Sequence, residues 1–201
     1  MVATCVSAVK GRVMRVVTLD ACGNPVTGAS SSQVVTRGFV SVKATPVYED
    51  GTEYTQKLAD GSLCVSDKAP AQLKRVTIDA SFCVFDPDLI TIISAARLLN
   101  SGTATGTGAA FSGSVNANRF SLDIWQDVSG NGACTAGGLQ QYLYWVWPNL
   151  GNGQISDYTI EDGVSQFKLT AETMSVGSLW GAGPGSTTWL NQVLLPGEHY
   201  A

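Results

Sequence analysis

Charged side chains are scarce in this sequence of 201 residues: only 14% are Asp, Glu, Lys or Arg, against ~25% in typical globular domains. Two explanations are open. Either much of the surface is buried against copies of the chain or a partner, or the solvent-exposed surface consists mainly of Ser, Thr, Asn and Gly. The net charge of −4 offers no cationic face for gripping nucleic-acid phosphates. An apolar share of 44% argues against disorder.

Histidine is almost missing, and this removes the commonest catalytic and metal-binding side chain. The one histidine, His199, lies next to the last residues of the sequence, where chains usually fray. The five cysteines are irregularly spaced without a C-x-x-C pair, so we expect reduced thiols and no zinc site. The sequence lacks the nucleophile-elbow and phosphate-loop motifs. We therefore expect no enzyme, no metal and no cofactor, and the sequence predicts neither a signal peptide nor a membrane span.

Alternating apolar and polar residues predict a mainly β protein with antiparallel sheets that each have one wet face. The period of two is clearest in residues 34–47, 73–85 and 119–126. In 119–126 the pattern places Arg119, Ser121 and Asp123 on the solvent face. Further β-like runs cover 12–19, 141–147, 154–161, 165–176 and 188–195, and glycine-rich turn signals such as 151–153 separate many of them. We expect two packed antiparallel sheets in a sandwich-like or barrel-like fold, with one flanking helix.

The helix is predicted over residues 86–99. Asp86 is a suitable N-cap, Pro87 suits the first turn, and Asp88 complements the helix dipole. Apolar residues then recur at helical spacing, and Asn100 begins a stop signal. Because the polar stripe is narrow, we expect the helix to be covered on most sides.

Two long segments do not fit a compact sandwich. Residues 48–71 join two long strands and carry most of the acidic excess, whereas residues 100–118 carry no charge. Connections longer than about 12–15 residues are uncommon unless they are functional or disordered. We expect both to order against another molecule, the alternative being loose surface loops.

Two further motifs leave alternatives open. Residues 127–132 place oxygen ligands as a calcium loop begins, but position twelve is Gly138; this predicts a hairpin turn or, at most, a weak cation site. The aromatic run 142–147 puts Tyr142 and Tyr144 on one face of a strand and Trp145 and Trp147 on the other. It indicates a strand covered on both sides, a subunit contact or a sugar-stacking platform.

Five motifs in order resemble a known family. They are RVMRVVTLDACG (12–23), GFVSV (38–42), DGSLCVSDK (60–68), QLKRV (72–76) and FCVFDPDL (82–89). Together they are similar to the major tail proteins of long-tailed actinobacterial phages, and they cover roughly residues 12–99. No motif of that family is evident in the second half of the chain.

The resemblance implies a structural virion protein and no enzyme. Such subunits form hexameric rings that stack into a tube around the tape measure protein, between the tail terminator and the distal tail proteins. The tube assembles in the bacterial cytoplasm, does not involve a membrane, and later conducts DNA without binding it specifically. The whole chain, 1–201, would be one tail-tube domain.

The family also suggests where subunits meet. The segment 48–71 would be the loop that reaches the next ring, with contributions from an N-terminal arm (1–11) and from the loop 100–118. The acidic balance would suit a lumen that repels DNA phosphates. The main alternative is a monomeric carbohydrate-binding β-sandwich that uses the exposed aromatics. The interface residues predicted on this basis are Glu49, Asp50, Glu53, Tyr54, Lys57, Asp60, Phe111, Tyr142, Trp145 and Trp147.

Overall fold

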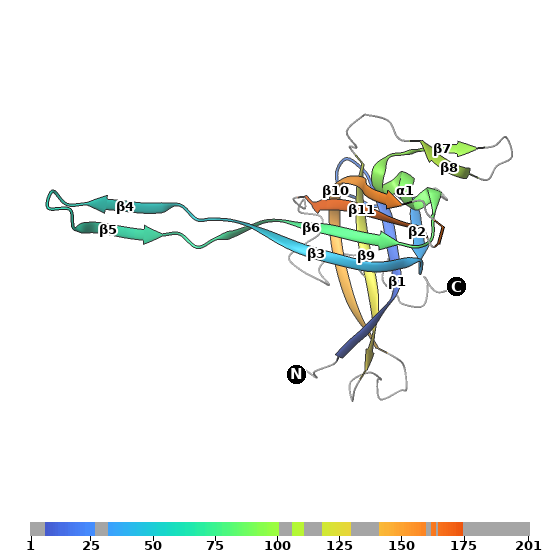
Figure 1. The fold of residues 1–201 in the computed structure, drawn as a ribbon, viewed down its shortest axis with the longest axis horizontal. Coiled ribbons are helices and arrows are strands. Elements are labelled where there is room, and N and C mark those ends of the chain that lie inside the picture. Colours follow the sequence, from blue (N-terminus) through green and yellow to red (C-terminus); the bar gives the residue numbers. More distant parts are fainter. Residues whose placement is uncertain are drawn as a thin grey trace.

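The computed structural model describes residues 7–26, 32–100, 106–110, 118–129, 141–159, 162–163 and 165–174. The protein is mainly β and sandwich-like, as predicted, with one short helix (Figure 1). Phe111, the run 188–195 and the first six residues of the predicted N-terminal arm lie outside the described residues. The remainder of that arm, from Ser7 onward, belongs to the first strand.

Seven strands form one antiparallel sheet in the order β2-β1-β9-β10-β11-β6-β3. Within the described residues, β2 and β3 at the two ends of this order are not paired, so the sheet does not close into a barrel. The strands are β1 (Ser7–Leu19), β2 (Gln33–Thr36), β3 (Phe39–Glu49), β6 (Gln72–Phe82), β9 (Arg119–Ser129), β10 (Tyr142–Thr159) and β11 (Gln166–Thr173).

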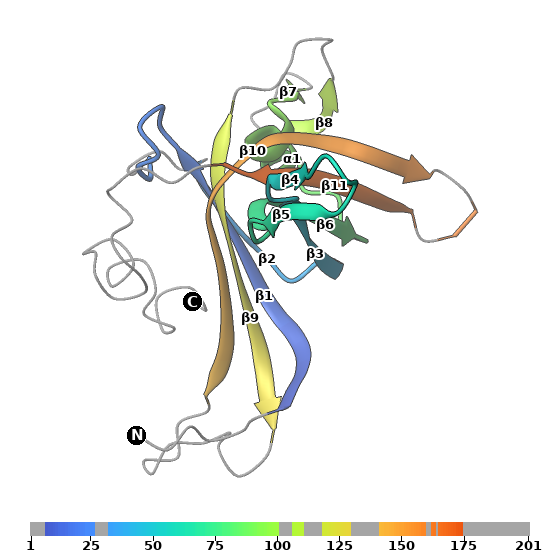
Figure 2. The same ribbon diagram turned by 90° about the vertical axis from the view of Figure 1, so that its left-hand side faces the viewer.

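The bent strand β10 lets one sheet supply both layers of the sandwich (Figure 2). Its first part, to Leu150, pairs with β9, and its second part, from Leu150 onward, pairs with β11. Gly153 approaches helix α1 so closely that a Cβ on it would lie 2.1 Å from the carbonyl oxygen of Ile93. The predicted turn at residues 151–153 is therefore wrong, because these glycines allow close backbone approach within a continuous strand.

The core lies between the two layers. Its buried side chains come from β1 and β9 on one side and from β6 and β11 on the other, with Met14, Phe120, Ile78 and Leu169 as examples. Helix α1 (Pro87–Ser94) adds Leu89, Ile90, Ile92 and Ile93 to the same core. The interior is thus made by the two halves of one folded sheet and completed by the helix.

The helix begins as predicted but ends earlier than residue 99. The Asp86 carboxylate accepts hydrogen bonds from the backbone amides of Asp88 and Leu89, which satisfies two of the free donors at this end. At the other end, Ala95 takes a left-handed conformation with φ 52° and donates its amide to the Thr91 carbonyl. The chain then leaves the helix axis, and Arg97–Asn100 forms strand β7.

Two small sheets project from the body. Strand β7 pairs with β8 (Gly106–Ala110), so the segment predicted as the uncharged loop 100–118 contains part of a hairpin. Strands β4 (Glu53–Lys57) and β5 (Leu63–Lys68) form a second ribbon that extends far from the body (Figure 1). The segment 34–47, expected as one alternating strand, is interrupted at Arg37 and Gly38 and divides into β2 and β3.

Candidate functional site

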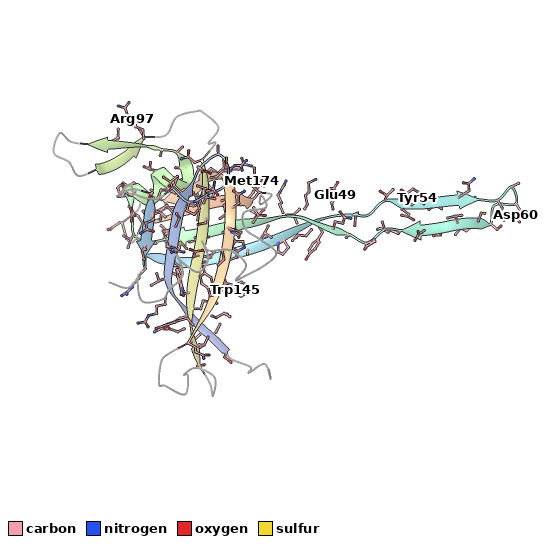
Figure 3. The ribbon with its side chains drawn as sticks, turned by 180° about the vertical axis from the view of Figure 1, so that it is seen from behind. Glu49, Tyr54, Asp60, Arg97, Trp145 and Met174 are labelled. Atoms are coloured by element: carbon pink, nitrogen blue, oxygen red, sulfur yellow. The ribbon has the colours of Figure 1, made fainter. Side chains whose placement is uncertain are left out.

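The segment 48–71, called the arm below, is the continuation of the ladder between β3 and β6. In that ladder Tyr48 pairs with Leu73 and Glu49 with Gln72. The two segments of the hairpin then cross at Gly51, where a Cβ would lie 1.9 Å from the Ala69 carbonyl oxygen. Beyond this crossing, the ribbon of β4 and β5 carries the chain to the tip near Asp60 (Figure 3). The arm is a β-hairpin anchored by two strands of the core sheet.

Every residue of β4 and β5 is exposed, on both faces of the ribbon. Tyr54 pairs with Asp67 and Gln56 with Val65, so these four side chains share one face. The opposite face carries the polar pairs of Glu53 with Lys68 and Thr55 with Ser66. An isolated two-stranded ribbon is at best marginally stable in water. This ribbon therefore has the form of an element that is completed by another surface.

The tip of the arm is a tight turn with apolar residues on both sides. The Asp60 carboxylate accepts hydrogen bonds from the Ser62 hydroxyl at 2.6 Å and the Ser62 amide at 2.9 Å. These bonds hold the pKa of Asp60 below its usual value. Gly61 takes a positive φ of 85°, as a turn of this kind requires. Leu58 and Leu63 flank the turn and are 50% and 59% exposed.

Apolar and acidic side chains are concentrated on the arm. Of fourteen large apolar side chains exposed in the described part of the chain, five lie on the arm, from Tyr48 to Val65. Five acidic and two basic residues give residues 48–71 a net charge of −3, out of −4 for the whole chain. The structure thus brings six of the predicted interface residues together on this exposed element, namely Glu49, Asp50, Glu53, Tyr54, Lys57 and Asp60.

The other predicted interface residues lie apart from the arm, on the first half of β10. Trp145 is 49% exposed, and its indole nitrogen donates to the Gln126 side chain at 2.8 Å. Its ring is nearly parallel to that of the half-buried Trp147, with ring centroids 6.4 Å apart. On the other face of the strand, Tyr142 lies under the Arg12 guanidinium. Both faces are partly covered, and Trp145 is the ring that remains accessible.

A buried ion pair on β1 and β9 was not predicted. Arg15 and Asp123 are 0% and 1% exposed, and Arg15 Nε donates to Asp123 Oδ2 at 2.7 Å. Arg15 Nη2 also contacts this oxygen. The expectation that residues 119–126 have one wet face is therefore wrong: of the three residues placed on that face, Ser121 and Asp123 are buried and Arg119 is half-buried.

Tyr144 lies beside this ion pair. Burial, together with the Asp123 charge, raises the pKa of the Tyr144 hydroxyl. The phenol therefore stays neutral, and we interpret the cluster of Arg15, Asp123 and Tyr144 as structural.

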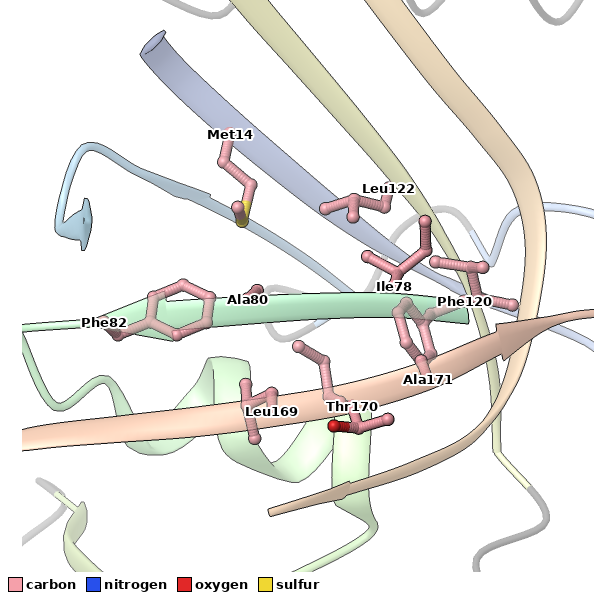
Figure 4. A pocket seen from close by; sticks show the side chains of 11 residues that line it. Met14, Ile78, Ala80, Phe82, Phe120, Leu122, Leu169, Thr170 and Ala171 are labelled. Atoms are coloured by element: carbon pink, nitrogen blue, oxygen red, sulfur yellow. The ribbon is translucent and has the colours of Figure 1, made fainter. Parts of the chain in front are cut away.

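An apolar cavity of about 20 Å³ lies in the core between the layers (Figure 4), and it is large enough for about one water molecule. The described residues include no cluster of three side chains suited to hold a metal. Asp127, the first residue of the calcium-like motif, instead contacts Lys10 and Arg12. No helix in the described ranges is long and apolar enough to cross a membrane.

No protein-family model matches the chain, and no curated protein matches it.

Proposed function

We propose that this protein is a structural subunit that assembles with copies of itself into the tail tube of a long-tailed phage. The observation that supports this most directly is the arm, a ribbon exposed on both faces that extends from a sandwich-like body. It comprises 24 residues, from 48 to 71, and stable interfaces use about 20–30 residues from each partner. The arm alone could supply one side of such an interface.

The low charge of the chain is consistent with this function. A subunit in a ring, with further rings above and below, has neighbours over much of its surface and needs fewer charged side chains to stay soluble. In our proposal six copies form each ring, and the rings stack around the tape measure protein. The tail terminator and distal tail proteins bind the ends of the tube. Assembly takes place in the host cytoplasm, and the product is part of the virion.

DNA would pass through this tube without being bound. With 16 acidic and 12 basic residues, the subunit is acidic, and an acidic wall repels phosphates at short range while salt screens the repulsion beyond ~8 Å. Charges mapped onto the lumen of a tube reconstruction test this part of the proposal. A lumen wall with net positive charge would be incompatible with it.

The experiment that tests the function removes the arm and leaves the body intact. Because Glu49 pairs with Gln72, residues 50–71 can be replaced by Asn-Gly, which closes a two-residue hairpin. We expect the full chain to form tubes in electron micrographs and the armless chain to form none, while a β-type circular dichroism spectrum shows that its body is folded.

The matched control keeps the arm and replaces Thr55 and Ser66, a polar pair on one face of the ribbon, by alanine; it should still assemble. A full chain that stays monomeric at all concentrations, even beside tail proteins, would contradict the proposal.

A carbohydrate-binding module is the second candidate, and Trp145 is the observation that favours it. Its exposed ring is held in place by Gln126 and lies parallel to Trp147, and such a surface can stack on a sugar ring. This alternative predicts glycan binding by the monomer that is lost in Trp145→Ala. Unchanged assembly of Trp145→Ala together with no glycan binding by the parent would eliminate it.

A further inference from the structure

A second exposed apolar patch lies at the end of the β3–β6 ladder opposite to the arm. Phe39 pairs with Phe82 at this end, and Val40 lies at the irregularity that follows Phe39 in β3. Val84 and Phe85 come just after the end of β6. Val40, Val84 and Phe85 are 54%, 53% and 49% exposed. We call this surface the distal patch. It was not predicted, because the alternation in 73–85 placed Val84 on the core face, whereas β6 ends at Phe82.

The distal patch is held rigidly to the ladder. The backbone amide of Cys83 donates to the Gly38 carbonyl at 3.1 Å, and Val84 packs so closely on Gly38 that a Cβ there would lie 2.6 Å from the Val84 Cβ. The edge of the Phe85 ring meets Phe167, with centroids 5.7 Å apart. Since these contacts fix the backbone, the exposed side chains form a preorganised surface.

The arm and the distal patch are opposite ends of one ribbon. From Phe39 to the tip at Asp60 the chain runs 21 positions along β3 and the arm, roughly 70 Å if it were extended throughout. In the described part of the chain these two ends hold eight of the fourteen exposed large apolar side chains. A head-to-tail interface requires two different surfaces at opposite ends of the molecule. A two-fold dimer instead needs one self-complementary surface.

We propose that the arm tip of one copy docks on the distal patch of the next copy along the tube. This inference rests on the proposed function, because it takes a second copy of the chain as the partner that covers the distal patch. It adds the surface on which the arm would dock. Leu58 and Leu63, which flank the arm tip, would cover Val40 and Val84. The exposed Arg37, in the turn beside Gly38, would lie among the acidic residues of the arm. The nearby Asp86 carboxylate is already used to cap α1.

Native cysteines make the docking directly testable. Cys64 lies on the arm and Cys83 beside the distal patch, and both are free and exposed. Nineteen positions separate them along the ribbon, an extended length of roughly 60 Å. A short bismaleimide spans a small fraction of that distance, so a link between these two thiols must join two copies.

The experiment treats assembled full-length protein with the bismaleimide and maps the linked peptides by mass spectrometry. We expect a Cys64–Cys83 link between copies that disappears in Cys64→Ser. In parallel, Val84→Asp should raise the concentration needed for assembly by about tenfold or more. Val26→Asp, at an exposed valine outside both surfaces, should leave it unchanged.

The outcomes separate the two proposals. Tubes in which Cys64 links only to Cys64 or to Cys22 would overturn the docking but leave the tube function standing. Tubes that form normally from Val84→Asp would do the same. A chain that does not assemble under any condition would overturn both.

Discussion

The buried pair of Arg15 and Asp123 makes a quantitative prediction about the stability of the body. Both groups are essentially inaccessible to water, so removing one leaves the other as an uncompensated buried charge. Such a change costs about 3–5 kcal/mol, whereas replacing both partners by apolar residues of similar volume is often neutral or stabilising. We expect Arg15→Met and Asp123→Leu each to lose about 3–5 kcal/mol, and the double variant to lose far less than either.

Urea unfolding of the armless protein, at concentrations at which it is monomeric, measures these free energies. Trp125 is 3% exposed and lies 5.5 Å from the Arg15 guanidinium, so its fluorescence reports on the neighbourhood of the pair. The comparison is valid if the dependence of the unfolding free energy on urea has the same slope in all variants. Since domain stability is typically about 5–15 kcal/mol, the single variants fall within the measurable range or unfold completely.

A matched surface pair provides the control. Lys168 and Asp157 lie 3.5 Å apart with side chains 54% and 58% exposed, and exposed pairs contribute about 0–1 kcal/mol. Lys168→Met should therefore change the free energy of unfolding by no more than that. If the Arg15 and Asp123 variants proved additive, with the double losing the sum of the singles, the buried pair would not act as a unit and the reasoning would be refuted.

Three further predictions concern the arm tip, the core cavity and the helix contact. Because hydrogen bonds from Ser62 lower the pKa of Asp60, the turn is stabilised above the unfolded pKa of the carboxyl group. This stabilisation is lost as the pH falls through the folded pKa. Ser62→Ala removes the hydroxyl bond and should raise the pKa of Asp60 in an NMR titration; an unchanged value would exclude the hydroxyl bond as a cause. Ile78, which lines the cavity, should lose about 0.5–1.5 kcal/mol of stability on change to Val; a stabilised Ile78→Val would show that the site is overpacked. Gly153→Ala should cost about 1–3 kcal/mol, since its Cβ would lie 2.1 Å from the Ile93 carbonyl oxygen; an unaltered thermal midpoint would show that α1 shifts freely.

The sequence correctly predicted those elements for which the local residue pattern and the tertiary structure favour the same conformation. The alternation in β6 and the capping residues Asp86 and Pro87 each indicated the structure that forms. The end of the helix was not predictable in this way, because Ala95 to Leu99 are good helix formers. There the tertiary structure outweighs propensity, and the chain turns at Ala95 to form β7.

The arm and the buried pair show two other limits of prediction. The length and charge of residues 48–71 indicated a projecting segment, but not that it would continue a ladder of the core; Asp60-Gly61, a common hairpin signal, was the available clue. Period-two alternation treated Asp123 as a solvent-facing residue, because the pattern contains no information on a partner 108 positions away. The distal patch depends on where β6 ends, and strand ends are poorly marked in sequence.

Beyond the crossing at Gly51, the length of the arm can be altered without changing the packing of the body. Outward from Gly51 the ribbon touches no core side chain that would fix its length, as the full exposure of β4 and β5 shows. Inserting two residues in each strand would extend the reach by about 7 Å and preserve which side chains share a face. An insertion of one residue per strand would instead exchange the two faces. Natural variation in this region should therefore favour even steps, and an engineered series of such insertions would act as a set of calibrated spacers between neighbouring subunits.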